Sequence, residues 1–318
     1  MDFQLTDDQQ ALVDAVQAIL ADNADLPQSE RLTYCCHDPA LQALLEDNGF
    51  LGAARSIGPI EAALVVHETA KSLFSIEAMV CGLVAPMTLP DVELAGPVAL
   101  VTERDLSKAI RNLTVARTLL VDCGDDVVML PVDQAEVVSV PTIYGYPFGR
   151  LIALPDLAGG QRFVGKGAAL RQWWRVGIAA EIAGAARAAI DFTIDYVKQR
   201  QVFGRPVGSF QSVQHRLVQR HGTVRAGYYL AMRAAWSGSV LDADIAGAHA
   251  VQGIQALLFD LHQFNGGMGV TLEYSLHFWT YRIRALQAEA GGITGMALDI
   301  ADKRWPEPSV PALASEGC

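Results

Sequence analysis

Apolar positions recur at steps of three and four residues over the first part of the chain, which predicts helices there. Thr6 and Gln9 have the spacing of a capping box, so we expect a helix to begin directly after Thr6. Gly49 is expected to end a second helix in a left-handed conformation, and a later helix is expected at residues 76–84. Residues 1–96 therefore indicate an N-terminal helical domain.

The pattern changes after Pro97 to short apolar runs rich in valine, which predict β-strands. Gly124 occupies the place of a hairpin tip between two of these runs. Gly159 and Gly160 indicate a linker into the segment that follows. We expect residues 97–165 to form a small, shortened β domain.

Long helical patterns return after this segment. The first is a stripe of Trp174, Ile178, Ile182, Ala185, Ala189, Thr193 and Tyr196. A third long helix is expected to begin at Asp242 or Asp244, and a fourth helical region to occupy residues 274–304. Long helices with short connections predict an antiparallel four-helix bundle over residues 166–305, followed by a flexible tail at 306–318.

Composition narrows the functional classes. Of the 318 residues, 51% are hydrophobic and 19% are charged, which supports a folded core. The net charge of −11 argues against a nucleic-acid partner. No apolar run approaches the length of a membrane span, and no basic and apolar leader opens the chain. Because the five cysteines have no metal-type or disulfide spacing, we expect a cytoplasmic protein without a metal site.

The signatures of several enzyme classes are absent from the sequence. It has no phosphate loop and no Gly-x-Gly-x-x-Gly between a strand and a helix, so nicotinamide binding is not expected. It also has no Gly-x-Ser-x-Gly elbow and no Glu-x-x-His pairs for a di-iron site.

One motif that carries chemical information follows the first long helix. Arg200 is expected at the helix terminus near Phe203, where a guanidinium can bind a pyrophosphate through two charge-assisted hydrogen bonds. Gln211, at the start of the next helix, can hydrogen-bond neutral groups of a cofactor.

The other motif lies where the third long helix ends. Gly266, Gly267 and Gly269 allow a bulky ligand to approach the backbone closely, and Gln263 lies just before them. Taken singly, Arg200 fits a solvated charge at a helix end, and the glycines fit a break between helices. Their combination at this spacing favours a binding site.

Together the two motifs resemble the acyl-CoA dehydrogenase family. The pattern Arg-x-x-Phe-Gly-x-Pro…Phe-Gln with Gln-x-x-Gly-Gly-x-Gly…Glu-Tyr matches in residue type and in spacing. The resemblance implies a mainly α fold, an acyl-CoA substrate, and FAD bound between the bundle of one subunit and the β domain of its neighbour. The ADP-side contacts that it implies are Arg200, Phe203, Gln211, Gln263, Gly266 and Gly267.

The sequence departs from the family where the catalytic base is expected. The reaction of the acyl-CoA dehydrogenase family removes an α-proton from the acyl-CoA thioester while a hydride passes from the β-carbon to the flavin. Ala290 stands at the common base position, and Trp174 at the alternative one. Glu289 lies one residue early, a rotation of about 100° on a helix, and Glu181 lies about two turns beyond Trp174. We therefore expect no catalytic residue in this chain and structural roles for both glutamates.

The β domain departs as well. Thr102 and Glu103 are a faint remnant of the family's Thr-Glu-Pro strand, with Arg104 in place of proline, and the Trp-containing flavin strand has no counterpart. The sequence thus keeps the contacts to the ADP part of FAD and lacks the contacts to the flavin ring.

This asymmetry suggests a heterotetramer, α2β2, in which a full-length acyl-CoA dehydrogenase partner supplies the flavin-ring contacts and the base. The chain is similar in size and pattern to the short subunits of actinobacterial steroid side-chain acyl-CoA dehydrogenases, which favours a steroid-derived acyl-CoA. Two alternatives stay open. One is an independent homo-oligomeric dehydrogenase with Glu289 or Glu181 as a displaced base, and the other is a non-catalytic scaffold subunit without flavin.

Overall fold

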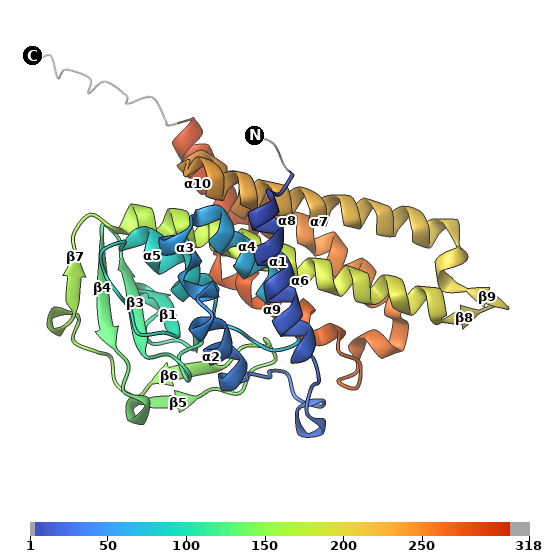
Figure 1. The fold of residues 1–318 in the computed structure, drawn as a ribbon, viewed down its shortest axis with the longest axis horizontal. Coiled ribbons are helices and arrows are strands. Elements are labelled where there is room, and N and C mark those ends of the chain that lie inside the picture. The colour runs from blue at the N-terminus through green and yellow to red at the C-terminus, as the bar shows by residue number, and fades with distance from the viewer. Residues whose placement is uncertain (1–3, 306–318) are drawn as a thin grey trace, which may run out of the picture.

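The computed structural model describes residues 4–305, so the predicted tail at 306–318 lies outside the described residues. Helices form both ends of the described chain and strands form its middle, which confirms the mainly α class. Two small sheets lie at one end of the molecule, and a two-residue-strand hairpin, β8 (Gln201–Val202) and β9 (Arg205–Pro206), lies at the other (Figure 1). Helix α6 (Gly167–Gln199) connects these two ends.

The N-terminal helices begin and end at the expected polar and glycine residues. Thr6 Oγ1 accepts the Gln9 N–H at 3.2 Å and Gln9 Oε1 accepts the Thr6 N–H at 3.1 Å, which confirms the capping box. Gly49 has a φ of +79°, as predicted. The helices are α1 (Asp7–Asp22), α2 (Pro39–Asp47), α3 (Ala53–Ser56), α4 (Pro59–Thr69), a π-helix (Val80–Val84) and α5 (Ala85–Thr88).

The helix predicted at residues 76–84 is displaced toward the C-terminus. The buried Glu77 carboxylate accepts the N–H of Val80 at 2.7 Å and that of Cys81 at 3.2 Å. It therefore satisfies the backbone donors at the start of the helix instead of forming part of it.

Two sheets share the middle of the chain. One has the strand order β1-β3-β4-β7, with β1 parallel to β3 and the other pairs antiparallel. The other is antiparallel, with the order β2-β6-β5. The strands are β1 (Val98–Thr102), β2 (Ile110–Arg111), β3 (Thr118–Cys123), β4 (Asp126–Pro131), β5 (Val137–Ser139), β6 (Phe148–Leu151) and β7 (Gln161–Phe163).

Glycines in this region have distinct roles. Gly124, with a φ of +82°, forms the β3–β4 hairpin tip as predicted. The linker predicted at Gly159 and Gly160 is wrong, because the chain continues there into β7, which pairs with β4. A Cβ on Gly160 would lie 2.6 Å from Val128 Cγ1, so a side chain would force this packing apart.

The bundle consists of long helices packed around α6, which contacts α4 and the helices that follow it. Gly184 allows α4 to approach closely, since a Cβ there would lie 2.1 Å from the His67 carbonyl oxygen. The remaining helices are α7 (Gln211–Ser237), α8 (Val240–Asn265), α9 (Leu276–Glu289) and α10 (Gly292–Arg304).

Two helix limits in the bundle differ from the prediction. Ser239, not Asp242 or Asp244, caps α8, and its Oγ accepts the Asp242 N–H at 3.4 Å. Asp244 is buried and pairs instead with Arg175 of α6. The fourth helical region is two helices, because Gly291, with a φ of +80°, separates α9 from α10.

Candidate cofactor site

The first motif begins where α6 ends. Arg200 is the C-cap residue, at the helix end where the macrodipole favours a cation. Its side chain is exposed and forms no ion pair within residues 4–305. This guanidinium is therefore available to an anion.

The tip of the β8–β9 hairpin is strained and exposed. Phe203 and Gly204 have φ values of +54° and +76°, the pattern of a type I′ turn. A non-glycine residue adopts this conformation at a cost of about 1–2 kcal/mol. Because Phe203 is also 92% exposed, it packs against little of its own chain. An aromatic side chain held in this way indicates a contact outside the chain.

Helix α7 begins at Gln211 without a side-chain cap, since its N-cap residue is Phe210. The Val213 N–H bonds to the Phe210 carbonyl at 3.0 Å, but the N–H groups of Gln211 and Ser212 have no partner among the described residues. The positive end of the helix dipole there favours a phosphate group. Arg205 lies over the Phe210 ring, with its guanidinium carbon 4.0 Å from the ring centroid. Another cation thus lies beside this helix start.

The second motif follows α8. Gly266 has a φ of +55° and a ψ of −140°, which glycine adopts without a steric penalty. Gly269 is tightly packed, because a Cβ there would lie 2.8 Å from the Asn265 Cβ. Gly267 differs, since a Cβ there would meet nothing within 4 Å. Packing within the described chain does not require glycine at this position, which leaves room for a group from outside.

Direct contacts tie the two motifs together. Asn265 Nδ2, at the end of α8, donates to Thr193 Oγ1 of α6 at 2.8 Å. The Tyr274 ring lies with its centroid 4.6 Å from that of Phe192 and 5.4 Å from that of Tyr196. The structure therefore brings both motifs to the same end of the bundle.

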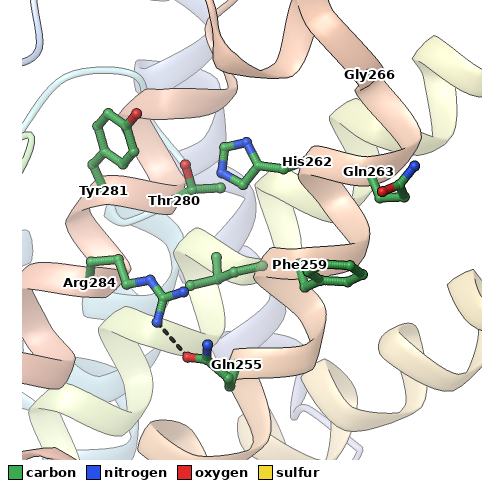
Figure 2. Close-up of a pocket in the computed structure, with 9 residues that line it drawn as sticks. Gln255, Phe259, His262, Gln263, Gly266, Thr280, Tyr281 and Arg284 are labelled. Atoms are coloured by element: carbon green, nitrogen blue, oxygen red, sulfur yellow. Dashed lines mark hydrogen bonds between the residues drawn. The ribbon is translucent and has the colours of Figure 1, made fainter.

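A cavity of about 470 Å³ adjoins the second motif (Figure 2). Gln263 and Gly266 line it, whereas the neighbouring Gly267 does not. Arg200, Phe203 and Gln211 also lie outside it, at the end of α6, at the hairpin tip and at the start of α7. In Figure 2, the Gln263 side chain projects from α8 away from the residues of α9. The predicted contacts thus form two neighbouring groups and not one pocket.

Sequence patterns missed two polar residues of this cavity. His262 Nδ1 donates to the Gly269 carbonyl at 2.8 Å, and burial lowers the pKa of His262 below its usual value. Arg284 of α9 donates to Gln287 Oε1 at 3.1 Å and to Gln255 of α8. His262 adjoins Gln263 in the sequence, which was one available signal, but Arg284 joins the cavity only through the packing of α9.

A buried ion cluster lies near the other end of α6. Arg111 of β2 binds Glu289 of α9 through two hydrogen bonds, with Nε 2.6 Å from Oε2 and Nη2 3.1 Å from Oε1. Trp174 Nε1 of α6 donates to the same carboxylate at 3.2 Å. Arg111 Nη1 also lies 3.7 Å from Glu181 Oε2. One guanidinium therefore pairs with both Glu289 and Glu181, the two glutamates that the sequence offers as displaced bases.

Burial and charge act in opposite directions in this cluster. Burial would lower the pKa of Arg111, but Glu289 and Glu181 raise it well above its usual range. Burial raises the pKa of Glu181, although Arg111 and the hydrogen bond from the Tyr146 hydroxyl, at 2.7 Å, oppose this. Each charge is thus held by its partners in a place that excludes water.

A cavity of about 730 Å³ adjoins the cluster, between the β unit and α9. The carboxylates that line it, Asp105 and Glu289, are both paired, Asp105 with Lys108 at 2.7 Å. Ala290 is the C-cap residue of α9 and offers no carboxylate, and Glu181 is not among the lining residues. This cavity therefore has no unpaired carboxylate. An adjoining cavity of about 740 Å³ is lined by both Glu289 and Ala290, and its lining includes Glu103, which forms no ion pair among the described residues.

Residues 4–305 hold neither a metal-type cluster nor a membrane-spanning helix. No group of three or more His, Cys, Asp or Glu in this part of the chain is arranged to hold a metal ion. No helix there has both the length and the apolar character needed to cross a membrane.

Comparison with known proteins gives a consistent picture. Residues 170–304 match the family model described as acyl-CoA dehydrogenase, C-terminal domain. The acyl-CoA dehydrogenase IpdE2 of Mycobacterium tuberculosis is 31% identical over 105 residues, which cover 33% of this chain and 33% of that protein. The chain thus spans about a third of the length of this curated relative.

Solved structures extend the likeness to nearly the whole chain. The ChsE4-ChsE5 complex of Mycobacterium tuberculosis has a chain with a TM-score of 0.77 and 19% identity, over 97% of this chain and 100% of that one. The butyryl-CoA dehydrogenase of Megasphaera elsdenii has a TM-score of 0.71 and 20% identity, over 96% and 100%. At these identities the likeness is one of fold.

Proposed function

Since residues 170–304 belong to the acyl-CoA dehydrogenase C-terminal domain family and the chain has the acyl-CoA dehydrogenase fold, we propose that it is a subunit of a flavin-dependent acyl-CoA dehydrogenase. In this proposal the chain supplies the ADP side of an FAD site. A full-length partner subunit supplies the flavin-ring contacts and the base. Bound FAD would accept the hydride that leaves the acyl-CoA.

The bundle end that carries both motifs supports this role, and it is the observation on which the proposal rests. Arg200 provides an unpaired cation, and the uncapped start of α7 provides N–H groups for a pyrophosphate. Gly267 leaves space for close backbone approach. Phe203 presents an exposed aromatic ring that a bound adenosine or a partner subunit would cover.

The length of α6 supports a cofactor shared between subunits. Arg200 and Trp174 lie about 39 Å apart along this helix, at a rise of about 1.5 Å per residue. The nucleotide end and the cavity beside Glu289 are therefore at opposite ends of the bundle. A cofactor held at Arg200 would meet its ring site on another subunit.

The cluster around Arg111 supports a heteromeric enzyme. Because Arg111 pairs with both Glu289 and Glu181, and Ala290 cannot take a proton, the base would come from the partner. Solved neighbours include the ChsE4-ChsE5 complex and a Tcur3481-Tcur3483 steroid acyl-CoA dehydrogenase variant. By extension we propose an α2β2 assembly in the cytoplasm that acts on a steroid-derived acyl-CoA.

The flavin content of the co-purified complex tests the ADP-side assignment. Replacing Arg200 by methionine (R200M) removes the unpaired cation, so we expect FAD affinity to fall about tenfold or more, because a charge-assisted bidentate contact is lost. The measurement is the visible absorbance per complex after gel filtration. K198M, at an exposed cation on the same helix end, serves as the control and should keep the wild-type flavin content.

The scaffold alternative predicts a different flavin absorbance for this variant. A scaffold subunit without flavin predicts that R200M leaves the flavin content of the complex unchanged. That result would remove the proposed ADP-side role.

A further inference from the structure

A separate cavity of about 410 Å³ lies beside the middle of α6, where α4 and α7 pack against it. Neither sequence motif contributes to it. Three basic side chains line it, one from each helix or its end: Lys71, Arg187 and Arg225. The carboxylates Glu68 and Asp191 line it as well, and both are paired.

His67 lines this cavity and has an unused ring nitrogen. Its side chain is 7% exposed, and its Nδ1 lies 2.9 Å from Glu68 Oε1. Lys71 Nζ and Gln17 Nε2 also donate to Glu68, at 2.6 and 2.7 Å, so this carboxylate is an ionised acceptor. The His67 proton therefore lies on Nδ1, which leaves a lone pair on Nε2. Nε2 has no hydrogen-bond partner among the described residues.

Hydrogen-bond donors accompany this acceptor. Arg225 of α7 donates to the Tyr229 hydroxyl at 3.0 Å and has no carboxylate partner within residues 4–305. Arg187 uses its Nε for Asp191 at 2.6 Å and its Nη1 for His221 at 3.2 Å, so Nη2 is left over. The Tyr228 ring lies 4.8 Å from that of His67, and burial raises the pKa of Tyr228 to about 12, so its hydroxyl keeps its proton.

These groups define the ligand chemistry. Three cations face two carboxylates, so the cavity is positive within a protein of net charge −11. A single unpaired acceptor, Nε2 of the largely buried His67, lies among the donors. We propose that this cavity binds a phosphate group, either as free hydrogen phosphate or as the monoester of a small molecule.

Hydrogen phosphate satisfies both kinds of group at once. Its anionic oxygens accept from Arg225, Arg187 and Tyr228, while its own O–H donates to His67 Nε2. Sulfate and simple carboxylates are fully ionised near neutral pH and have no proton to donate. His67 therefore selects phosphate over sulfate. The site is independent of the proposed cofactor role.

Isothermal titration of the full chain, in the assembly in which it purifies, tests this site near neutral pH. We expect saturable binding of inorganic phosphate and at least tenfold weaker binding of sulfate. R225M should weaken phosphate binding at least tenfold, and its exposed position spares the fold. R233M, an exposed arginine on the same helix outside the cavity, is the matched control and should bind as the wild type does. H67F should abolish the preference for phosphate over sulfate.

Titrations with glycerol 3-phosphate and glycerol, which lack an adenine, distinguish the two sources of phosphate. Glycerol 3-phosphate that binds more tightly than phosphate, with no binding of glycerol, supports a monoester ligand. Phosphate that binds at least as tightly as glycerol 3-phosphate supports the free anion. The proposal is overturned if neither binds, if sulfate equals phosphate in the wild type, or if R225M binds phosphate as the wild type does.

Discussion

Arg111 determines what the cavity beside Glu289 can do. Its side chain is buried, and its two hydrogen bonds to Glu289 join β2 to α9. Removing one member of a buried ion pair leaves a charge without compensation, which destabilises proteins strongly. Glu289 precedes Ala290, which stands where the resemblance places the catalytic base. Its hydrogen bonds to Arg111 and Trp174 instead connect the sheets to the bundle.

Replacing Arg111 by methionine should therefore lower the free energy of unfolding by about 3–5 kcal/mol. In the triple variant R111M/E181Q/E289Q most of this loss should be recovered, because no unpaired carboxylate remains. Urea unfolding followed by circular dichroism measures both effects. R111M that unfolds like the wild type would show that the cluster contributes nothing.

E289Q completes this test at the level of activity. We expect dye reduction by the complex to stay within about twofold of the wild type, since the base is expected on the partner. An inactive E289Q complex that retains its flavin would instead support the displaced base.

Sequence spacing could mark Arg200, Phe203 and Gln263, because their signal is local. Arg111 could not be found in this way, since Glu289 is 178 positions away along the chain. Its strand β2 has only two residues, too few for any periodic pattern.

Among the elements, the β8–β9 hairpin places an aromatic residue in an unfavourable backbone conformation. Phe203 adopts a positive φ and lies 92% exposed at the tip. This arrangement does not stabilise the isolated chain. We therefore expect Phe203 to make a stabilising contact only in the assembled complex with FAD bound.

F203G separates these two effects. Glycine relieves the strain, so the free energy of unfolding of the chain should stay within about 1 kcal/mol of the wild type or rise slightly. The assembled complex should lose FAD faster on dialysis, because the aromatic contact is gone. W236A, at an exposed aromatic residue near the far end of α7, is the control for exposure alone. Equal flavin retention in F203G and the wild type would remove Phe203 from the site.

Helix α4 carries a carboxylate whose ionisation stabilises the fold. Burial would raise the pKa of Glu68, but the hydrogen bond from His67 and the hydrogen bonds and charge of Lys71 lower it to about 2 from the usual 4.5. A folded-state pKa below the unfolded value adds stability above about pH 4.5, and this stability is lost as the pH falls toward 2.

E68Q removes this contribution. It should cost a few kcal/mol at pH 7, and the difference from the wild type should shrink as the pH is lowered below 4.5. Urea unfolding of both proteins at several pH values measures this trend. A difference that does not change with pH would show that Glu68 stabilises the helix by packing alone.

Elements with local signals were predictable, and those set by distant contacts were not. The Thr6 cap and the Gly49 stop follow from neighbouring residues. Asp244 was a reasonable cap for α8 from sequence, but it is buried against Arg175 of α6, a contact between distant segments. Gly160 resembled a linker because the three residues of β7 that follow gain their order only by pairing with β4.

The two ends of the whole molecule differ in structure. Both motifs lie at the hairpin end of the molecule, and the sheets lie at the other end (Figure 1). Strand β2 of these sheets carries Arg111 of the ion cluster. This division agrees with the proposal that the chain supplies the ADP side of a shared FAD site and that a partner supplies the base.

The number of FAD molecules per assembled complex tests this account most directly. The chain should be purified alone and together with its partner, and flavin should be counted against protein by absorbance. We expect a colourless chain alone and about one FAD per two chains in the complex, since each site needs the ADP side of one subunit and the ring side of the other. A yellow, active homo-oligomer of this chain would contradict the account.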